Sequence, residues 1–285
     1  MTSDAAPPFI RLGPDEPNSP VVVSVPHAGR NYGPQLLGGS RLPQSALELL
    51  EDRLADRLVW RATEAGVVTF VAQAPRAEID LNREERELDP AIIAPPLPPA
   101  HVVQSARIRG GIGLIPTRIT GFGAIWRSPI PRDELTRRIT QIHRPYHAAI
   151  DAALRAARAR FGAAVLLDCH SMPPRPDGEP PIVFGDRHGT AAAPGLLDAA
   201  VSAAAVLGYR SALNDPYAGG HVVARHGRPD RNIHALQIEI DRSAYLDTEL
   251  RAPGPGFAAI CRLVAAVAEA LEARILGTAQ PLAAE

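Results

Sequence analysis

The chain has 285 residues and a formal net charge of −1, which is enough for one large α/β domain or two small ones. Its 30 basic residues, all arginine, are scattered among 31 acidic ones, so no segment carries the charge of a nucleic-acid-binding surface. Two cysteines are too few for a disulfide scaffold, and no stretch reaches the roughly 18 apolar residues of a membrane span. The first residues also lack the pattern of a signal peptide, so we expect a cytoplasmic protein without nucleic-acid or membrane partners.

The first part of the chain predicts a strand, a helix and a strand in turn. After a proline-rich lead over 1–20, the β-branched run at 20–29 predicts a buried strand that stops at Pro26. Leucines at helical spacing predict a helix over 45–65, and a second strand follows over 66–75. This order is typical of a parallel sheet with crossover helices.

The middle of the chain contains a long segment, about 90–131, that is rich in proline and glycine. It is too long for an ordinary connection, so we expect a lid, a binding loop or a disordered tract there. A long helix is predicted over 131–160, and Pro145 should kink or divide it. The helix leads into a buried strand at 163–173, which carries histidine close to its end.

The C-terminal part predicts a helix over 192–207, a loop over 214–232, a strand over 233–241 and a helix over 255–275.

Together these elements predict one α/β domain over 21–276, followed by a tail at 277–285. We expect three layers, with a mixed, mainly parallel sheet and helices on both faces.

Three side chains share a place at the end of a predicted strand: His27, His170 and Glu239. Ligands of open α/β sheets bind at the carboxyl ends of the strands, so these residues are expected to converge. A catalytic zinc ion takes three protein ligands from histidine, aspartate or glutamate and keeps a position open for water. The two histidines would supply two of them, although a lone histidine at a strand end is more often structural.

The third ligand would be an acid from the segment after the first strand, which offers Glu51, Asp52 and Asp56. The alternative is that these acids form the solvated face of an amphipathic helix, and the residues alone do not choose. Asp168 points to the same face of its strand as His170 and is a candidate acceptor for the ring of that histidine.

Two further groups suit an acidic ligand. Arg83 is able to grip a carboxylate through two parallel hydrogen bonds beside the amide of Asn82, unless it is an ordinary surface arginine. His221 and Arg225 lie in a glycine-containing basic loop, a composition that many loops share. The sequence has no G-x-S-x-G, Walker A, HExxH or CxxC motif for a competing chemistry.

Six segments in this order resemble the N-formylglutamate amidohydrolase family, which is related to the zinc carboxypeptidases and to aspartoacylase: SVPHAG, EDRLADRL, IDLNR, LLDCHSMP, GGHVVARHGRP and HALQIEIDRSAYLD. The resemblance runs from about Val21 to Arg274. It implies a carboxypeptidase-like fold with one Zn²⁺ ion.

The resemblance also implies residue roles. His27 and His170 match metal ligands, Asp52 is the preferred third ligand, and Glu51 is kept in reserve. Glu239 matches the expected general base.

The substrate-binding roles follow from the same resemblance. Asn82 and Arg83 would bind the terminal carboxylate of the substrate, and His221 and Arg225 would contact its side-chain carboxylate. Tyr146 and His147 match as well, with a role in support or in the pocket wall.

The implied reaction is hydrolysis of N-formyl-L-glutamate or a similar N-acyl amino acid, as in histidine degradation. The alternatives are a related zinc deacylase or a non-catalytic binding protein on the same fold. Arg53 stands where the family usually has an aromatic residue, so the resemblance implies the reaction type more directly than the substrate. The oligomeric state cannot be read from the sequence.

Overall fold

A computed structural model of the chain describes residues 7–103 and 105–277. The predicted lead over 1–20 therefore lies partly outside the described residues, and the predicted tail over 277–285 lies almost wholly outside them. The chain divides into two compact units. The first holds the residues up to Ile10 with Pro26–Asp52 and Phe70–Ala149, and the second holds Arg11–Val25, Arg53–Thr69 and the chain from Ile150 onward.

A seven-stranded sheet has the order β1-β3-β2-β8-β11-β9-β10. The chain of β1 and of β3 passes from one unit into the other, and the remaining five strands belong to the second unit. The β2/β8, β8/β11 and β9/β10 pairs are parallel, while β11 and β9 are antiparallel. The bounds are β1 Phe9–Leu12, β2 Val21–Val25, β3 Val68–Ala72, β8 Ala164–Met172, β9 Ile182–Gly185, β10 Ser211–Leu213 and β11 Ile233–Asp241.

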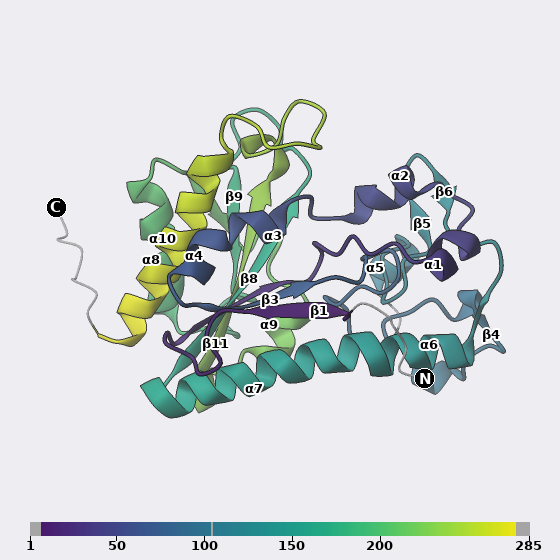
Figure 1. Cartoon of the computed structure of the whole chain (residues 1–285), viewed down its shortest axis with the longest axis horizontal. Coiled ribbons are helices and arrows are strands. Elements are labelled where there is room, and N and C mark those ends of the chain that lie inside the picture. Colours follow the sequence, from purple (N-terminus) through teal and green to yellow (C-terminus); the bar gives the residue numbers. More distant parts are fainter. Residues whose placement is uncertain (1–6, 104, 278–285) are drawn as a thin grey trace. The chain divides into compact units, whose positions relative to one another are not determined.

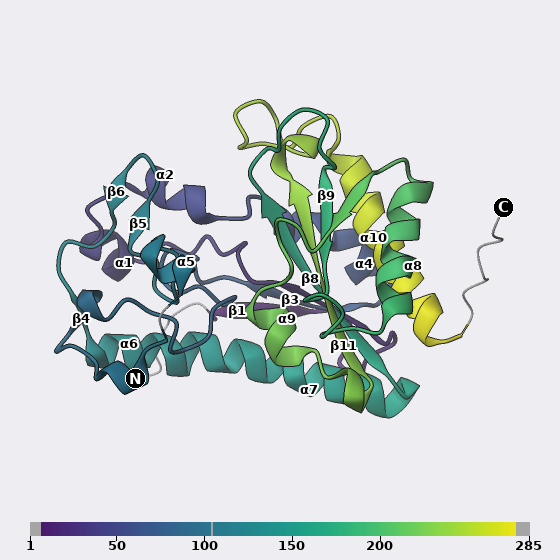
Figure 2. The same ribbon diagram turned by 180° about the vertical axis from the view of Figure 1, so that it is seen from behind.

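Helices of the second unit cover both sides of its strands. Figures 1 and 2 show α8 and α10 on one side of β8 and β11, and α9 on the other. Helix α10 packs along α8 and touches β2 and β8, while α9 packs on β8 and β11. The predicted mixed, mainly parallel α/β class is thus confirmed. The bounds are α3 Ala55–Leu58, α4 Trp60–Glu64, α8 Pro194–Val206, α9 His221–His226 and α10 Phe257–Ile275.

The first unit is built from short elements. Two small ribbons, β4/β7 and β5/β6, and the helix α5 occupy the proline- and glycine-rich segment. In the described part of this segment, none of these elements is longer than four residues, which agrees with the long irregular segment predicted at about 90–131. The bounds are α1 Pro34–Gly39, α2 Gln44–Leu47, β4 Ile93–Ala94, α5 Ala106–Arg109, β5 Arg118–Ile119, β6 Gly123–Ala124, β7 Ile130–Pro131 and α6 Arg132–Arg138.

The continuous helix predicted over 45–65 is wrong. Helix α2 and a 3-10 turn end before Glu51, which is extended, and Leu54 adopts a left-handed conformation with φ of 60° before α3 begins. Leucines on both sides of the break are buried, so the helical spacing continues although the helix does not.

The long helix predicted over 131–160 is divided, as Pro145 suggested. A π-helical segment, Ile139–His143, separates α6 from α7, which runs over Arg144–Phe161. Proline has no backbone N–H to donate to the preceding turn, so the regular α pattern is interrupted close to it.

The loop predicted over 214–232 contains the helix α9, which two glycines and three basic residues concealed in the sequence. Strands β1, β9 and β10 were not predicted, since each has only three or four residues. No helix among the described residues is long and apolar enough to cross a membrane.

Candidate active site

His27 lies in the first unit, two residues after the end of β2, and is buried. Its Nε2 donates to Oδ1 of Asp80 over 2.7 Å, and its Nδ1 lies 3.3 Å from Oδ2 of Asp52. A carboxylate only accepts, so the proton of the ring sits on Nε2. The imidazole is therefore fixed in one tautomer with Nδ1 turned toward a second carboxylate.

The break in the predicted helix puts Glu51 and Asp52 in the interior, with 1% and 2% of their surfaces exposed. The alternative of a solvated helix face is excluded for these two acids. The backbone N–H of Asp52 donates to the carbonyl of His27 over 3.0 Å, and Glu51 accepts a hydrogen bond from the hydroxyl of Tyr32 over 2.6 Å. The backbone thus links Asp52 directly to the segment that carries His27.

Asp80 is a site residue that the sequence reasoning missed. It is fully buried, and besides His27 it accepts from Nε of Arg76 over 2.9 Å and from the backbone N–H of Asn82 over 2.8 Å. Burial alone would raise its pKa, but the positive charges of Arg76 and Arg83 and the hydrogen bond from His27 hold the pKa well below its usual range. Asp80 is therefore a permanent carboxylate against the His27 ring. The signal that was available is an acid between two apolar residues in the segment EIDLN.

Asn82 and Arg83 follow Asp80 on the same turn and are 5% exposed. Nε of Arg83 donates to the carbonyl of Ile112 over 2.8 Å, and its NH1 donates to the carbonyl of Asn82 over 2.7 Å. Burial lowers the pKa of Arg83, which the charge of Asp80 opposes. Arg83 is thus not an ordinary surface arginine, and its fork is anchored at two of its three nitrogens.

In the second unit, His170 and Asp168 face the same side of β8. Nε2 of His170 donates to Oδ2 of Asp168 over 2.8 Å, and the hydroxyl of Ser24 donates to Oδ1 of the same carboxylate over 2.5 Å. All three residues are buried. The arrangement repeats that of His27 and Asp80, because again a carboxylate occupies Nε2 and orients the ring.

Glu239 lies directly opposite His170 in the register between β11 and β8. Paired residues of neighbouring strands project to the same face, so this carboxylate and this imidazole are neighbours. Nε2 of Gln237 donates to Oε1 of Glu239 over 2.9 Å, and Oε1 of Gln237 accepts from the backbone N–H of Gly220 over 3.0 Å. Gly220, in the turn before α9, therefore holds the side chain of Gln237, and Gln237 in turn orients the carboxylate of Glu239.

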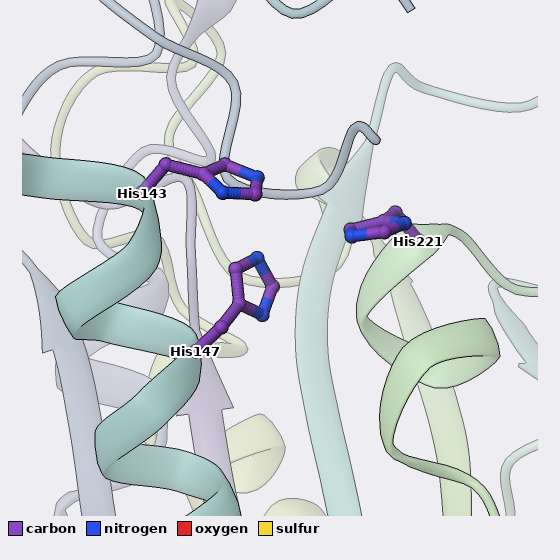
Figure 3. Close-up of side chains that lie close together, drawn as sticks. All are labelled: His143, His147 and His221. Atoms are coloured by element: carbon purple, nitrogen blue, oxygen red, sulfur yellow. The ribbon is translucent and has the colours of Figure 1, made fainter. Parts of the chain in front are cut away.

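His221 is the first residue of α9 (Figure 3), and Arg225 lies one turn later on the same face. His221 is partly buried and Arg225 is exposed. The neighbouring His226 is buried, and burial together with the charge of Arg225 lowers its pKa to about 3. The basic groups that α9 presents are therefore His221 and Arg225, because His226 stays uncharged near neutral pH.

The structure gathers the predicted residues within each unit. The first unit brings together His27, Asp52 and, through Asp80, the turn with Asn82 and Arg83. The second unit brings together residues of β8, β11 and the start of α9: Asp168, His170, Gln237, Glu239 and His221.

The family model for N-formylglutamate amidohydrolase matches residues 19–246. The chain belongs to this family. The match covers every residue of the candidate site described above, from Ser24 to Glu239. The resemblance stated from the six sequence segments is thereby confirmed.

Relatives and a solved structure agree with membership of the N-formylglutamate amidohydrolase family. The chain is 29% identical to the N-formylglutamate deformylase of Pseudomonas aeruginosa, over 81% of this chain and 83% of that one. It is 28% identical to the N-formylglutamate deformylase of Pseudomonas putida, over 80% of this chain and 82% of that one. The fold is also similar to the crystal structure of N-formylglutamate amidohydrolase from Ralstonia eutropha JMP134. The two structures match with a TM-score of 0.87 and 32% sequence identity, over 95% of this chain and 99% of that chain.

Proposed function

We propose that this protein hydrolyses the formyl amide of N-formyl-L-glutamate to formate and L-glutamate, using one bound Zn²⁺ ion. The observation that carries the proposal is the pair of buried histidines, each with Nε2 bonded to a buried aspartate: His27 with Asp80 and His170 with Asp168. Carboxylate–histidine pairs of this kind are the usual support of histidine metal ligands. Membership of the family and similarity to two deformylases supply the substrate.

The proposed metal ligands are His27 and His170, each through Nδ1, and Asp52. Two imidazoles and one carboxylate form a donor set that zinc takes in catalytic sites, with a fourth position open. Asp52 is preferred to Glu51 because its carboxylate lies 3.3 Å from Nδ1 of His27, whereas Glu51 accepts the hydroxyl of Tyr32. The register also supports the set: Ser24 pairs with Asp168, and the two histidines follow these residues by three and two positions.

When bound, the ion lowers the pKa of a coordinated water and polarises the formyl carbonyl. The carboxylate of Glu239 accepts a proton from the attacking water and delivers it to the amine that leaves, so one group acts as base and then as acid. Gln237 keeps this carboxylate oriented through its bond to Oε1. The C–N bond breaks, the water oxygen remains on formate, and glutamate departs with the proton.

The carboxylates of the substrate would be held by two groups. Nε and NH1 of Arg83 bond to backbone carbonyls, and the remaining N–H groups of its guanidinium would bind the terminal carboxylate beside Asn82. His221 and Arg225 on α9 would contact the side-chain carboxylate. Holding both ends converts binding energy into correct placement of the formyl carbon. We further propose that the enzyme works in the cytoplasm, in the degradation of histidine.

The test combines metal analysis with a substrate panel. The purified protein should contain one zinc per chain, lose formate release on chelation and regain it when zinc is added. N-formyl-L-glutamate should be preferred to N-acetyl-L-glutamate, N-succinyl-L-glutamate and N-formyl-L-alanine. Preference for another acyl group or a monocarboxylic product would instead identify a related deacylase, and an inert, metal-free protein would identify a binding protein.

A variant pair tests the ligand assignment. His170→Ala should lose zinc and formate release, whereas His188→Asn, which changes an exposed histidine in a left-handed conformation that asparagine tolerates, should keep both. Full zinc content and activity in His170→Ala would overturn the proposed site.

A further inference from the structure

The turn that carries Asn82 and Arg83 is closed on its inner side by Asp80. The side chain of Asp80 accepts the backbone N–H of Asn82 over 2.8 Å, and its carbonyl accepts the backbone N–H of Arg83 over 3.2 Å. These two bonds use only the backbone N–H groups of Asn82 and Arg83, and they leave the backbone carbonyls of the turn to other donors. The carbonyls of Leu81 and Arg83 therefore need donors from elsewhere, because both residues are buried and an unpaired buried carbonyl is costly.

Two histidines of one helix face donate to these carbonyls. Nε2 of His147 lies 2.9 Å from the carbonyl oxygen of Leu81, and Nε2 of His143 lies 2.8 Å from that of Arg83. A carbonyl only accepts, so both rings carry a proton on Nε2. Figure 3 shows the two rings one helical turn apart, and their centroids are separated by 4.5 Å.

The spacing of donors and acceptors matches. Residues four apart in a helix lie on one face and rise by about 6 Å, so the two rings reach alternate carbonyls of the turn that Asp80 closes. His143 faces Arg83 and His147 faces Leu81, and both rings are fully buried.

The π-helical segment sets the direction of these rings. It ends at His143, and α7 with His147 follows directly. A π turn contains more residues than an α turn, and each added residue rotates the following side chains by about 100° relative to the preceding helix. The interruption thus allows α6 to keep its own buried face while His143, at the end of the π-helical segment, and His147, in α7, both face the turn at Asp80.

We propose that His143 and His147 are positioning residues, which hold the turn at Leu81–Arg83 so that Asn82 and Arg83 present their side chains to the terminal carboxylate of the substrate. The inference rests on the proposed function for the identity of that carboxylate. The two imidazoles act through the backbone of the turn and do not touch the substrate.

The test uses four variants of the full protein. His143→Leu and His147→Leu remove the donor at similar volume, whereas His143→Gln and His147→Gln keep an N–H group at nearly the reach of Nε2. His234→Leu is the control, because His234 is also a buried histidine and its Nδ1 has no hydrogen-bond partner among the described residues.

The kinetic readout compares N-formyl-L-glutamate with its α-amide, which lacks the terminal carboxylate. We expect each leucine variant to lower kcat/KM for N-formyl-L-glutamate about tenfold, since the contacts of Asn82 and Arg83 with the carboxylate both bind the substrate and place its formyl carbon. The α-amide should show no such change, and the glutamine variants should recover most of the loss. Equal losses on both substrates, or glutamine variants no better than leucine variants, would overturn the proposal.

A second readout does not depend on activity. Hydrogen–deuterium exchange over residues 79–84 should be faster in the leucine variants and close to wild type in the glutamine variants and in His234→Leu. Unchanged exchange would overturn the positioning role even if N-formyl-L-glutamate proves to be the substrate. Faster exchange in an enzyme that prefers another substrate would instead overturn the proposed function and retain the positioning role.

Discussion

Nε2 of His27 donates to Oδ1 of Asp80 over 2.7 Å, although 53 residues separate the two along the chain. Asp80 is held as a carboxylate by the positive charges of Arg76 and Arg83, so the bond from His27 is charge-assisted and orients the ring strongly. The same relation between His170 and Asp168 spans only two residues of β8. One histidine is thus oriented by tertiary structure, and the other by its own strand.

Asp80→Asn should weaken zinc binding about 10- to 100-fold, the usual cost of losing the acceptor behind a histidine ligand. The amide removes the charge but keeps the volume. Competition with a chromophoric chelator measures the affinity, and Asp177→Asn, at an exposed position, is the control. Equal zinc affinity in Asp80→Asn and wild type would show that the His27 ring is oriented without this carboxylate.

Glu239→Gln should lower kcat for N-formyl-L-glutamate about 10²- to 10⁴-fold, because the amide cannot accept the proton of the attacking water. KM and zinc content should change little, since the side chain keeps its size. Steady-state formate release measures the effect, with the exposed Glu249→Gln as control. A loss of zinc in Glu239→Gln would mean that Glu239 is a metal ligand instead of a base.

Gly29→Ala should destabilise the protein and disturb His27. A Cβ at Gly29 would lie 2.0 Å from the carbonyl oxygen of Ala74, a backbone atom that cannot move aside cheaply. We expect a loss of at least about 3 kcal/mol in the free energy of unfolding, together with weaker zinc binding. Gly33→Ala is the matched control because a Cβ there meets nothing within 4 Å, and its stability should stay within about 1 kcal/mol of wild type. Similar unfolding curves for the two variants would contradict the prediction.

His226 should make the stability depend on pH. Its pKa is about 3 in the folded protein, whereas an unfolded histidine titrates near 6.5. Between these values the unfolded chain binds more protons, so stability rises with pH, by up to about 1.4 kcal/mol per unit, and the contribution is complete above about pH 6.5. His226→Leu should flatten this slope in urea unfolding between pH 4.5 and 7.5, and His188→Asn should leave it unchanged. Identical slopes in His226→Leu and wild type would refute the assignment.

The regular elements with a clear pattern could be predicted from the sequence. Strand β11 has the predicted bounds, and α8 and α10 lie within two residues of theirs. In each of these segments the apolar residues follow a single spacing, that of a strand or that of a helix, and turn residues mark both ends. The local pattern therefore agrees with the tertiary structure. At 45–65 the local pattern and the tertiary structure disagree, because Leu54 adopts a left-handed conformation that interrupts the helix and that the periodicity does not reveal.

The candidate site was predictable where a residue type and a strand end coincide, as at His170 and Glu239. Asp80 was not, because its partner His27 lies on another element and only the folded chain brings the two together. The role of His143 was hidden for a similar reason. A π-helical segment has no sequence signature of its own, so the direction of a side chain at its end, such as that of His143, cannot be obtained by counting residues.

The neighbouring strands β2 and β8 have a consequence for how the protein is made. Ser24 and Asp168, which hydrogen-bond across them, are separated by 144 residues. About half of the chain is therefore synthesised between β2 and its neighbour β8, and such distant parallel pairing forms slowly. His27 is synthesised long before His170, so the proposed metal site, which uses both histidines, can be completed only after β8 has been made.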